Sequence, residues 1–363
     1  MQNVRSRRGF LTLAGGTVAA LAGCLDDDDA RSAAEAGSQG DPPDEVGLPV
    51  DDADVPLDFD LEEYENSAQR GAEKDAIPSI DDPVFGDVSA GDGMLDPGDP
   101  VFGVDIDGDA RAYPQRILVS HEIVNDDFGD RGIAVTYCPL TGTAVGFERG
   151  SVEFGVSGML INSNLVMYDR ETNTWWPQIL GTGVLGQLTG KRLNEIRVTW
   201  TTWGRWKAVH PETAVLTEDT GYVRNYDRDP YGSYNPPDGY YENSTVLFDI
   251  LHDDERHHPK EVVVGARTAD GPMAFHTDRL REDRLLETVV GGTQYLAAYE
   301  PELDTGYIYR NAAGDTYESQ EDRFVTPDGE HRPADGLSLD PVNAFDAMWF
   351  AWAAFYPNTV LED

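Results

Sequence analysis

Apolar and polar side chains alternate along the middle of the chain as they do in β-strands. Residues 101–106 alternate in this way, an Asp-Gly pair follows at 107–108, and residues 110–113 continue the pattern. Successive side chains of a strand point to opposite faces and glycine accepts a positive φ, so this stretch predicts a β-hairpin. Residues 133–137 are almost entirely apolar and predict a buried strand.

The same pattern occurs a second time. Residues 102–113 are matched without gaps by residues 264–275, and a tryptophan-bearing segment at 203–213 is matched by residues 349–359. Similarity at a fixed spacing indicates repeated structural units. We therefore predict a β-rich α+β fold that is internally duplicated. Each copy is expected to be a small sheet or barrel-like set of strands closed by a Trp-bearing helix.

The last helix is expected to begin at residue 340. Asp340 has a side chain suited to an N-cap, and Pro341 suits the first helical turn. Large apolar residues follow at helical spacing, which predicts a stripe that packs in the core. The stripe consists of Phe345, Met348, Trp349, Trp352 and Phe355.

The amino terminus has the pattern of an export signal. Arg7 and Arg8 resemble the core of a twin-arginine signal, and the apolar stretch at 10–23 is only 14 residues long. A helix needs about 20 apolar residues to span a bilayer, so this stretch predicts a signal peptide rather than a membrane span. It ends in Leu-Ala-Gly before Cys24, which resembles a lipoprotein processing box. We expect an exported protein, anchored by lipid on Cys24 to the outer face of the cytoplasmic membrane.

The chain is strongly acidic, with 67 Asp and Glu against 27 Lys and Arg and a formal net charge of −40. This charge excludes the basic surface that nucleic-acid binding requires, and it argues against docking on anionic lipids through a basic patch. Excess acid with arginine favoured over lysine is expected for a protein that works in very high salt, where charge repulsion is screened. The four lysines are Lys74, Lys191, Lys207 and Lys260.

Composition and repeats divide the chain into five parts. An acidic segment with few aromatic residues follows the signal and is expected to be a disordered tether. A second acidic segment connects the two copies. The predicted boundaries are 1–24 for the signal, 25–76 for the tether, 77–217 for the first copy with the candidate site, 218–261 for the connection and 262–363 for the second copy.

Cys138 is the most informative single residue. Once Cys24 carries lipid, Cys138 is the only remaining thiol, so an intrachain disulfide is excluded. It follows the predicted strand at 133–137 and precedes Pro139, which places it at a strand end. A free thiol outside the cell is exposed to oxidation, whereas a buried one behaves as a small apolar side chain.

The first interpretation is a nucleophilic site. If residues 119–124 pair with the strand at 133–137, His121 lies opposite or next to Cys138; a helix over 115–123 leaves the geometry open. An adjacent imidazole favours the thiolate, so Cys138 would act as the nucleophile and His121 as its base. Asn125 or Glu122 would then orient the imidazole.

The second interpretation is a soft-metal site. Cys138 and His121 would bind a metal such as copper, with the thioether of Met159 or Met167 as a further ligand. The histidines at 252, 257 and 258 lie in the acidic connection, where an exposed loop is the favoured interpretation over a metal site.

The third interpretation is an inert thiol in a surface scaffold or a solute-binding lipoprotein. A stretch without a counterpart in the second copy supplies polar residues that either line a pocket for a small molecule or satisfy turns and strand ends. The candidate pocket residues are Asn162, Asn164, Asp169, Tyr137 and Thr141. No glycine-rich phosphate loop, GxSxG elbow or HExxH helix occurs in the sequence, so the sequence alone does not decide whether the protein is an enzyme.

Several motifs together resemble the DUF3179 family. They are Ala-Arg-Ala-Tyr-Pro at 110–114, His-Glu-Ile-Val-Asn-Asp at 121–126, Thr-Tyr-Cys-Pro-Leu at 136–140, Gly-Val-Ser-Gly at 155–158, the stretch at 162–170 and Tyr-Asp-Arg-Asp-Pro-Tyr at 226–231. The resemblance runs from about residue 82 to the carboxyl end. The family is a domain of unknown function, so the resemblance implies no reaction. Many members carry Cys-Pro-Leu-Cys where this chain has Cys-Pro-Leu-Thr at 138–141. The missing second cysteine argues against a dithiol redox pair or a CxxC metal site here. It leaves a single-thiol site, or a pocket built by the hydroxyls of Thr141 and Thr143.

Overall fold

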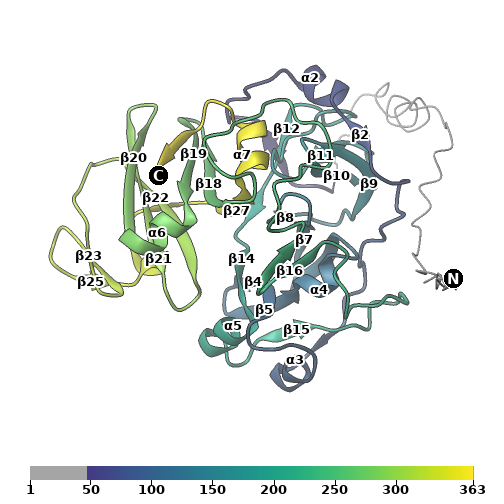
Figure 1. Ribbon diagram of the computed structural model, residues 1–363, viewed down its shortest axis with the longest axis horizontal. Helices are drawn as coiled ribbons and strands as arrows, with labels where there is room; N and C mark the ends of the chain where they lie inside the picture. Colours follow the sequence, from purple (N-terminus) through teal and green to yellow (C-terminus); the bar gives the residue numbers. More distant parts are fainter. Residues whose placement is uncertain (1–46, 363) are drawn as a thin grey trace, which may run out of the picture.

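The computed structural model describes residues 47–362 and is rich in β-structure (Figure 1). No described helix exceeds seven residues. None of the helices between residues 47 and 362 is both long and apolar enough to cross a membrane. The predicted signal, Cys24 and the first part of the predicted tether lie outside the described residues.

Two sheets of the first half contain the predicted hairpin and the predicted strand at 133–137. Strands β4 and β5 pair around Asp107 and Gly108, whose φ angles of 55° and 89° confirm the expected turn. The first sheet has the order β14-β4-β5-β15-β3, and the second β13-β8-β7-β6. The strands are β3 (Phe85–Gly86), β4 (Pro100–Ile106), β5 (Asp109–Pro114), β6 (Ile123–Phe128), β7 (Arg131–Cys138), β8 (Thr143–Glu148), β13 (Glu195–Ile196), β14 (Thr199–Thr202) and β15 (Ala214–Leu216).

The second half has sheets with corresponding strand orders. The order β27-β18-β19-β28 corresponds to β14-β4-β5-β15, and β20-β21-β22-β26 corresponds to β6-β7-β8-β13. In both halves the last strand, β15 or β28, pairs in parallel with the hairpin. The strands are β18 (Val262–Thr268), β19 (Gly271–His276), β20 (Leu285–Val290), β21 (Thr293–Glu300), β22 (Thr305–Asn311), β26 (Asp340–Val342), β27 (Ala344–Met348) and β28 (Val360–Glu362).

A tryptophan from a short helix packs on a glycine in each half. In the first half, a Cβ atom added at Gly103 would lie 2.2 Å from the ring of Trp206 on α5 (Trp203–Val209). The Trp206 indole donates a hydrogen bond of 2.9 Å to Thr213. Glycine is therefore required where the ring crosses the strand. The equivalent residues of the second half are Gly265, Trp352 on α7 (Trp349–Phe355) and Thr359.

The expected start of the last helix is wrong. Asp340 lies in β26, which pairs with β22, and residues 344–348 form β27, which pairs with β18. The helix begins only at Trp349. The aromatic stripe is nevertheless buried, as expected. A barrel-like copy is also not found, because the strands described between residues 47 and 362 form separate small sheets.

Residues 47–76, which the sequence placed in the disordered tether, contain regular structure. Residues 47–76 include β1, which pairs with β12, and β2, which extends a sheet of order β11-β10-β9-β2. Tyr64 on α2 is fully buried and its hydroxyl donates to the carbonyl of Phe355. These apolar contacts hold the segment on the body despite its acidic composition. The elements are β1 (Val50–Asp52), α2 (Leu61–Asn66), β2 (Gln69–Arg70), β9 (Phe154–Ile161), β10 (Asn164–Asp169), β11 (Trp175–Pro177) and β12 (Lys191–Leu193).

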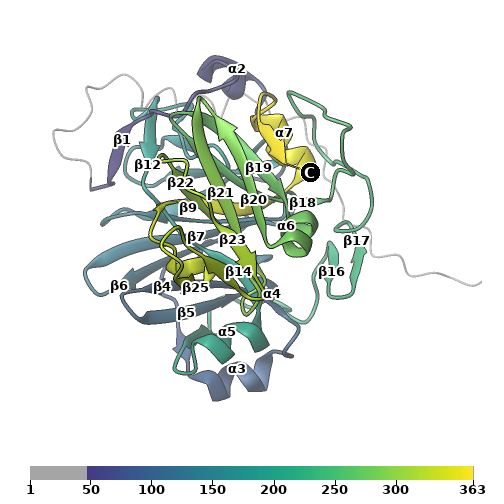
Figure 2. The same cartoon turned by 90° about the vertical axis from the view of Figure 1, so that its left-hand side faces the viewer.

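The two halves lie on either side of α7 (Figure 1). Strands β16 and β17 form a small antiparallel hairpin, which is labelled at the right of the second view (Figure 2). The remaining elements are α3 (Val88–Met94), α4 (Gln115–Leu118), β16 (Gly232–Tyr234), β17 (Pro237–Gly239), α6 (Thr277–Asp283), β23 (Glu318–Gln320), β24 (Arg323–Val325), β25 (His331–Arg332) and the 3₁₀ turn η1 (Ala334–Gly336).

Candidate functional site

A cavity of about 560 Å³ lies where the two halves meet, and we call it the junction cavity. The first half contributes one wall, the β16–β17 segment a second, and the start of β18 with α6 and β27 a third. Its volume is in the range of small-molecule sites. The residues that line it include Trp200, Thr201, Tyr234, Tyr241, Lys260, Thr277 and Asp346.

Lys260 is the most unusual residue of this cavity. It lies two residues before β18 and is only 6% exposed. Its Nζ atom has no hydrogen-bond partner among the described residues and sits 3.2 Å from the ring centroid of Tyr240. Burial lowers the pKa of Lys260 to about 7. The amine of Lys260 can therefore donate a hydrogen bond to a molecule bound in the cavity.

Two further polar groups of the cavity lack a hydrogen-bond partner among the described residues, and a third is poorly hydrated. The hydroxyl oxygens of Thr201 and Thr277 are buried without a partner among the described residues. Loss of hydration raises the pKa of Asp346 to about 6. Buried polar atoms are usually hydrogen-bonded, so their concentration on one surface marks a site that accepts a polar molecule.

Cys138 ends β7, as predicted, and is 1% exposed. Its sulfur accepts a hydrogen bond of 3.4 Å from the backbone N–H of Leu165 and donates to the carbonyl of Ser163 at 3.8 Å. Burial, and next the charge of Glu122, raise the pKa of the thiol to about 11. The sulfur is therefore a protonated thiol at neutral pH.

Glu122 connects α4 to β6 in a left-handed conformation, with φ of 59°. Its carbonyl accepts from the N–H of Tyr137 and its own N–H donates to Leu118, both at 2.7 Å. A non-glycine residue in this region costs roughly 1–3 kcal/mol, and such strain gathers at functional sites. Burial raises the pKa of Glu122 to about 8, so its side chain is a neutral acid at pH 7.

The His121 side chain makes its hydrogen bonds away from Cys138. The β6–β7 ladder pairs Ile123 with Thr136, a register that would set His121 opposite Cys138, but the left-handed Glu122 interrupts the strand. The imidazole Nδ1 donates to the carbonyl of Pro78 at 2.7 Å, and Nε2 accepts from the hydroxyl of Tyr226 at 2.6 Å. This assignment follows from the partners. Both ring nitrogens are occupied, so the imidazole accepts no proton from the thiol in this structure.

The metal interpretation loses its nitrogen ligand for the same reason. Met167 on β10 is fully buried, and its backbone is opposite Val156 and Trp176. Both nitrogens of His121 are hydrogen-bonded to protein groups, so copper binding by Cys138, His121 and Met167 would require one of these hydrogen bonds to break. Burial lowers the pKa of His121, which also keeps the ring neutral.

The candidate asparagines hold backbone groups. The Asn125 amide donates to Asp81 at 2.8 Å and exchanges hydrogen bonds with the backbone of Phe154. Asn162 occupies the turn between β9 and β10 with φ of 53°, and it joins the backbone of Ala354 to that of Leu251. Both side chains therefore have structural roles. Neither residue is among those that line the junction cavity.

The side chains of Asn164 and Asp169 are also hydrogen-bonded within the fold. Asn164 donates to the Thr141 hydroxyl at 3.0 Å, and its oxygen accepts from the N–H of Ile179. Asp169 accepts from the indole of Trp176 at 3.0 Å and from its own following turn. The Thr141 side chain also hydrogen-bonds the sulfur of Cys138 and lowers the pKa of that thiol.

Tyr137 stands directly behind the cavity wall. Its hydroxyl lies 3.0 Å from that of Tyr234, whose ring stacks on Tyr241 with centroids 3.8 Å apart. Tyr241 donates to Asp229 at 2.7 Å, which also accepts from Gln115. This network fixes the aromatic wall.

Sequence reasoning missed the residues that face the cavity. Lys260 carried one signal, because it is one of four lysines in an arginine-rich chain. The other signal was the concentration of tyrosines between residues 231 and 241. Glu122 was considered only as a partner of His121, although the Glu122 carboxylate is the one coupled to Cys138.

Comparison with known families gives one match. A family model described as a protein of unknown function (DUF3179) matches residues 74–359. No curated protein and no solved structure matches the chain.

We expect Cys138 to react slowly in the folded protein. In a chain carrying Cys24→Ser, Cys138 is the only thiol, so its rate with an aromatic disulfide reagent can be followed by absorbance. Burial and a pKa near 11 predict a rate at neutral pH at least about 100-fold below that of the same chain in denaturant. A native rate equal to the unfolded rate would contradict a buried, protonated thiol.

Glu122→Gln is expected to weaken the dependence of stability on pH. The carboxyl titrates near 4.5 in the unfolded chain and near 8 in the folded one, so the folded state holds one more proton between these values. The free energy of unfolding should fall as pH rises through this window, by roughly 1.4 kcal/mol per pH unit. Glutamine cannot ionise, so urea unfolding near both limits should show a smaller loss in the variant. Equal losses in both proteins would refute the raised pKa.

Proposed function

The chain belongs to the DUF3179 family, whose description names no reaction, and we propose that it is a solute-binding lipoprotein that holds a small carboxylic acid in the junction cavity. The observation that carries this proposal is the Nζ atom of Lys260, which is buried on the cavity wall with no hydrogen-bond partner within residues 47–362. Leaving a donor unpaired costs about 1–3 kcal/mol, more for a charged group. A bound carboxylate would receive that donor in a charge-assisted hydrogen bond.

The other walls favour a flat, apolar body on the ligand. Trp200 packs edge-on against Tyr234 with centroids 5.1 Å apart, and Tyr234 is stacked on Tyr241. Aromatic rings provide contact area and prefer offset or edge-to-face partners. The hydroxyls of Thr201 and Thr277 supply further hydrogen-bonding positions.

The charge around the cavity favours a singly charged ligand. Arg281 is already paired with Asp278 and Asp304, so it does not offset the carboxylates nearby. Glu242 and Glu261 also line the cavity. A polyanion such as a phosphate ester would be repelled, whereas one carboxylate can be held by Lys260.

The single thiol takes part as a neutral neighbour in this proposal. Lys260 is coupled electrostatically to Cys138, and Cys138 to Glu122. The thiol and the Glu122 carboxyl are neutral at pH 7, whereas Lys260, with a pKa of about 7, can carry the positive charge that a carboxylate ligand would stabilise. Cys138 is therefore assigned to shaping the site rather than to nucleophilic attack.

Export and lipid anchoring belong to the proposal. They are supported by Arg7 and Arg8 before an apolar stretch and by the Leu-Ala-Gly that precedes Cys24. The net charge of −40 suits an extracytoplasmic protein in concentrated salt, where the charges are screened. A tethered solute-binding protein captures its ligand at the membrane surface.

We also propose that the two halves arose by duplication of one unit. Support comes from the corresponding strand orders and from the repeated contact of a helix tryptophan with a strand glycine. The junction cavity lies between the halves, so duplication would have created the site. The residues that line it differ between the halves, which accounts for a single asymmetric cavity.

Benzoate is the probe that tests the binding proposal. We expect titration calorimetry to detect one benzoate per chain, and Lys260→Met to weaken binding about 10–100-fold, since a hydrogen bond to a charged group contributes about 1.5–3 kcal/mol. Methionine keeps the length of the side chain and removes the donor.

Lys207→Met is the matched control. Lys207 is bound to Asp92 on the surface, so this variant should bind benzoate as the wild type does. Benzyl alcohol, which lacks the carboxylate, should bind weakly to all three proteins. Equal affinity of wild type and Lys260→Met for benzoate, or no benzoate binding at all, would refute the proposal.

A further inference from the structure

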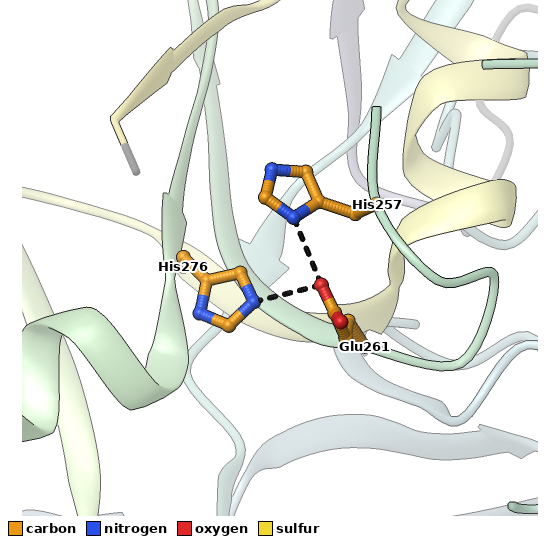
Figure 3. A group of neighbouring side chains, drawn as sticks. All are labelled: His257, Glu261 and His276. Carbon is orange, nitrogen blue, oxygen red and sulfur yellow. Dashed lines mark hydrogen bonds and ion pairs between the residues drawn. The ribbon is translucent and has the colours of Figure 1, made fainter. Parts of the chain in front are cut away.

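Two histidines and a glutamate converge next to the junction cavity. His257 Nδ1 lies 2.8 Å from Glu261 Oε2, and His276 Nε2 lies 3.1 Å from the same oxygen (Figure 3). The three ligand atoms all lie within 4.8 Å of one another. Figure 3 shows both rings turned toward the carboxylate from different segments of the chain.

Each of the three residues is fixed by a contact with a strand or with α7. Glu261 directly precedes β18, and its carbonyl accepts from the N–H of Trp349 at 2.7 Å. His276 is the last residue of β19, adjacent to β18 in the same sheet. The ring of His257 packs edge-on against Trp349, with centroids 5.4 Å apart.

The exposure of the three side chains is suited to a bound ion. The side chains of His257 and His276 are 17% and 15% exposed, whereas that of Glu261 is 39% exposed. The histidines are thus fixed inside the wall, and the carboxylate opens toward the junction cavity, which it lines. An ion can reach this position from the cavity.

We propose that His257, Glu261 and His276 form a binding site for a divalent transition-metal ion, of which Zn²⁺ is the best-suited example. Two imidazole nitrogens and one carboxylate oxygen are the usual protein ligands of zinc sites that keep one coordination position open. The donor set contains no thiolate, so it favours zinc and similar divalent ions over Cu(I). This site is separate from the copper site considered at Cys138, and it does not depend on benzoate binding.

The residues come from places that the sequence pattern could not connect. His257 lies in the acidic connection, which was interpreted as an exposed loop, and His276 ends a hairpin in the second half. Pairing of β18 with β19 brings His276 near Glu261, and packing of the His257 ring against Trp349 brings the third residue to them. The proposal gives His257 a role as a metal ligand, where the sequence pattern favoured an exposed loop over a metal site.

Zinc titration of chelator-treated protein tests the site. Molar NaCl in the buffer suppresses weak binding of cations to the acidic surface. We expect calorimetry with zinc chloride to give one tight site per chain. His276→Gln and Glu261→Gln should each weaken that site at least about 100-fold, beyond the effect of losing an outer partner of a ligand.

His331→Gln is the control, because His331 is exposed on β25 and belongs to no cluster of ligands in the described part of the chain. It should bind zinc as the wild type does. Thermal unfolding gives a second readout, since zinc should raise the Tm of the wild type and of His331→Gln but not of the ligand variants. Circular dichroism verifies that each variant is folded.

Cobalt provides a readout that needs no variant. Co²⁺ added to the wild type should give visible absorption bands of an ion with nitrogen and oxygen ligands. No zinc binding to the wild type would overturn the proposal. Zinc binding of equal strength in the wild type and in both ligand variants would also overturn it, because it would place the ion elsewhere on the acidic surface.

Discussion

The backbone at the start of α7 holds the two halves together. The N–H of Met348 donates to Thr141 in the first half at 2.9 Å, and those of Trp349 and Phe350 donate to Glu261 and Pro259. The first amides of a helix have no partner within the helix, so carbonyls from distant segments complete them here. This one set of hydrogen bonds places the end of β7, the segment before β18 and the last helix around a common point.

The candidate chemistry follows from that arrangement. Lys260 lies between two residues whose carbonyls receive α7 amides, so its side chain is fixed on the cavity wall. The Nζ atom of Lys260 lies over the ring of Tyr240, and it is 4.7 Å from the ring centroid of Phe350 on α7. The fold thus holds an amine with a lowered pKa against aromatic rings, without an anionic partner among the described residues. Cation–π contacts offset part of the cost of its burial, by about 0.5–2 kcal/mol.

The local sequence pattern predicted the β4–β5 hairpin. It did not predict the backbone conformations that set the direction of the candidate side chains. Asp107-Gly108 identified its turn correctly because glycine is permissive there. Nothing in the sequence marks Glu122 as left-handed, and that single residue turns His121 away from Cys138. Asp340 looked like a helix cap, yet distant carbonyls decide that the helix begins at Trp349. Lysine is rarely buried, so no local rule could place Lys260 inside.

The unfolding free energy of Lys260→Met in ligand-free protein tests the central claim most directly. If the buried amine serves ligand binding and destabilises the ligand-free fold, Lys260→Met should raise the free energy of unfolding in urea by about 1–3 kcal/mol. The surface variant Lys207→Met should stay within about 0.5 kcal/mol of the wild type. A loss of stability of similar size in Lys260→Met would show that the fold itself needs the amine, and it would contradict the account.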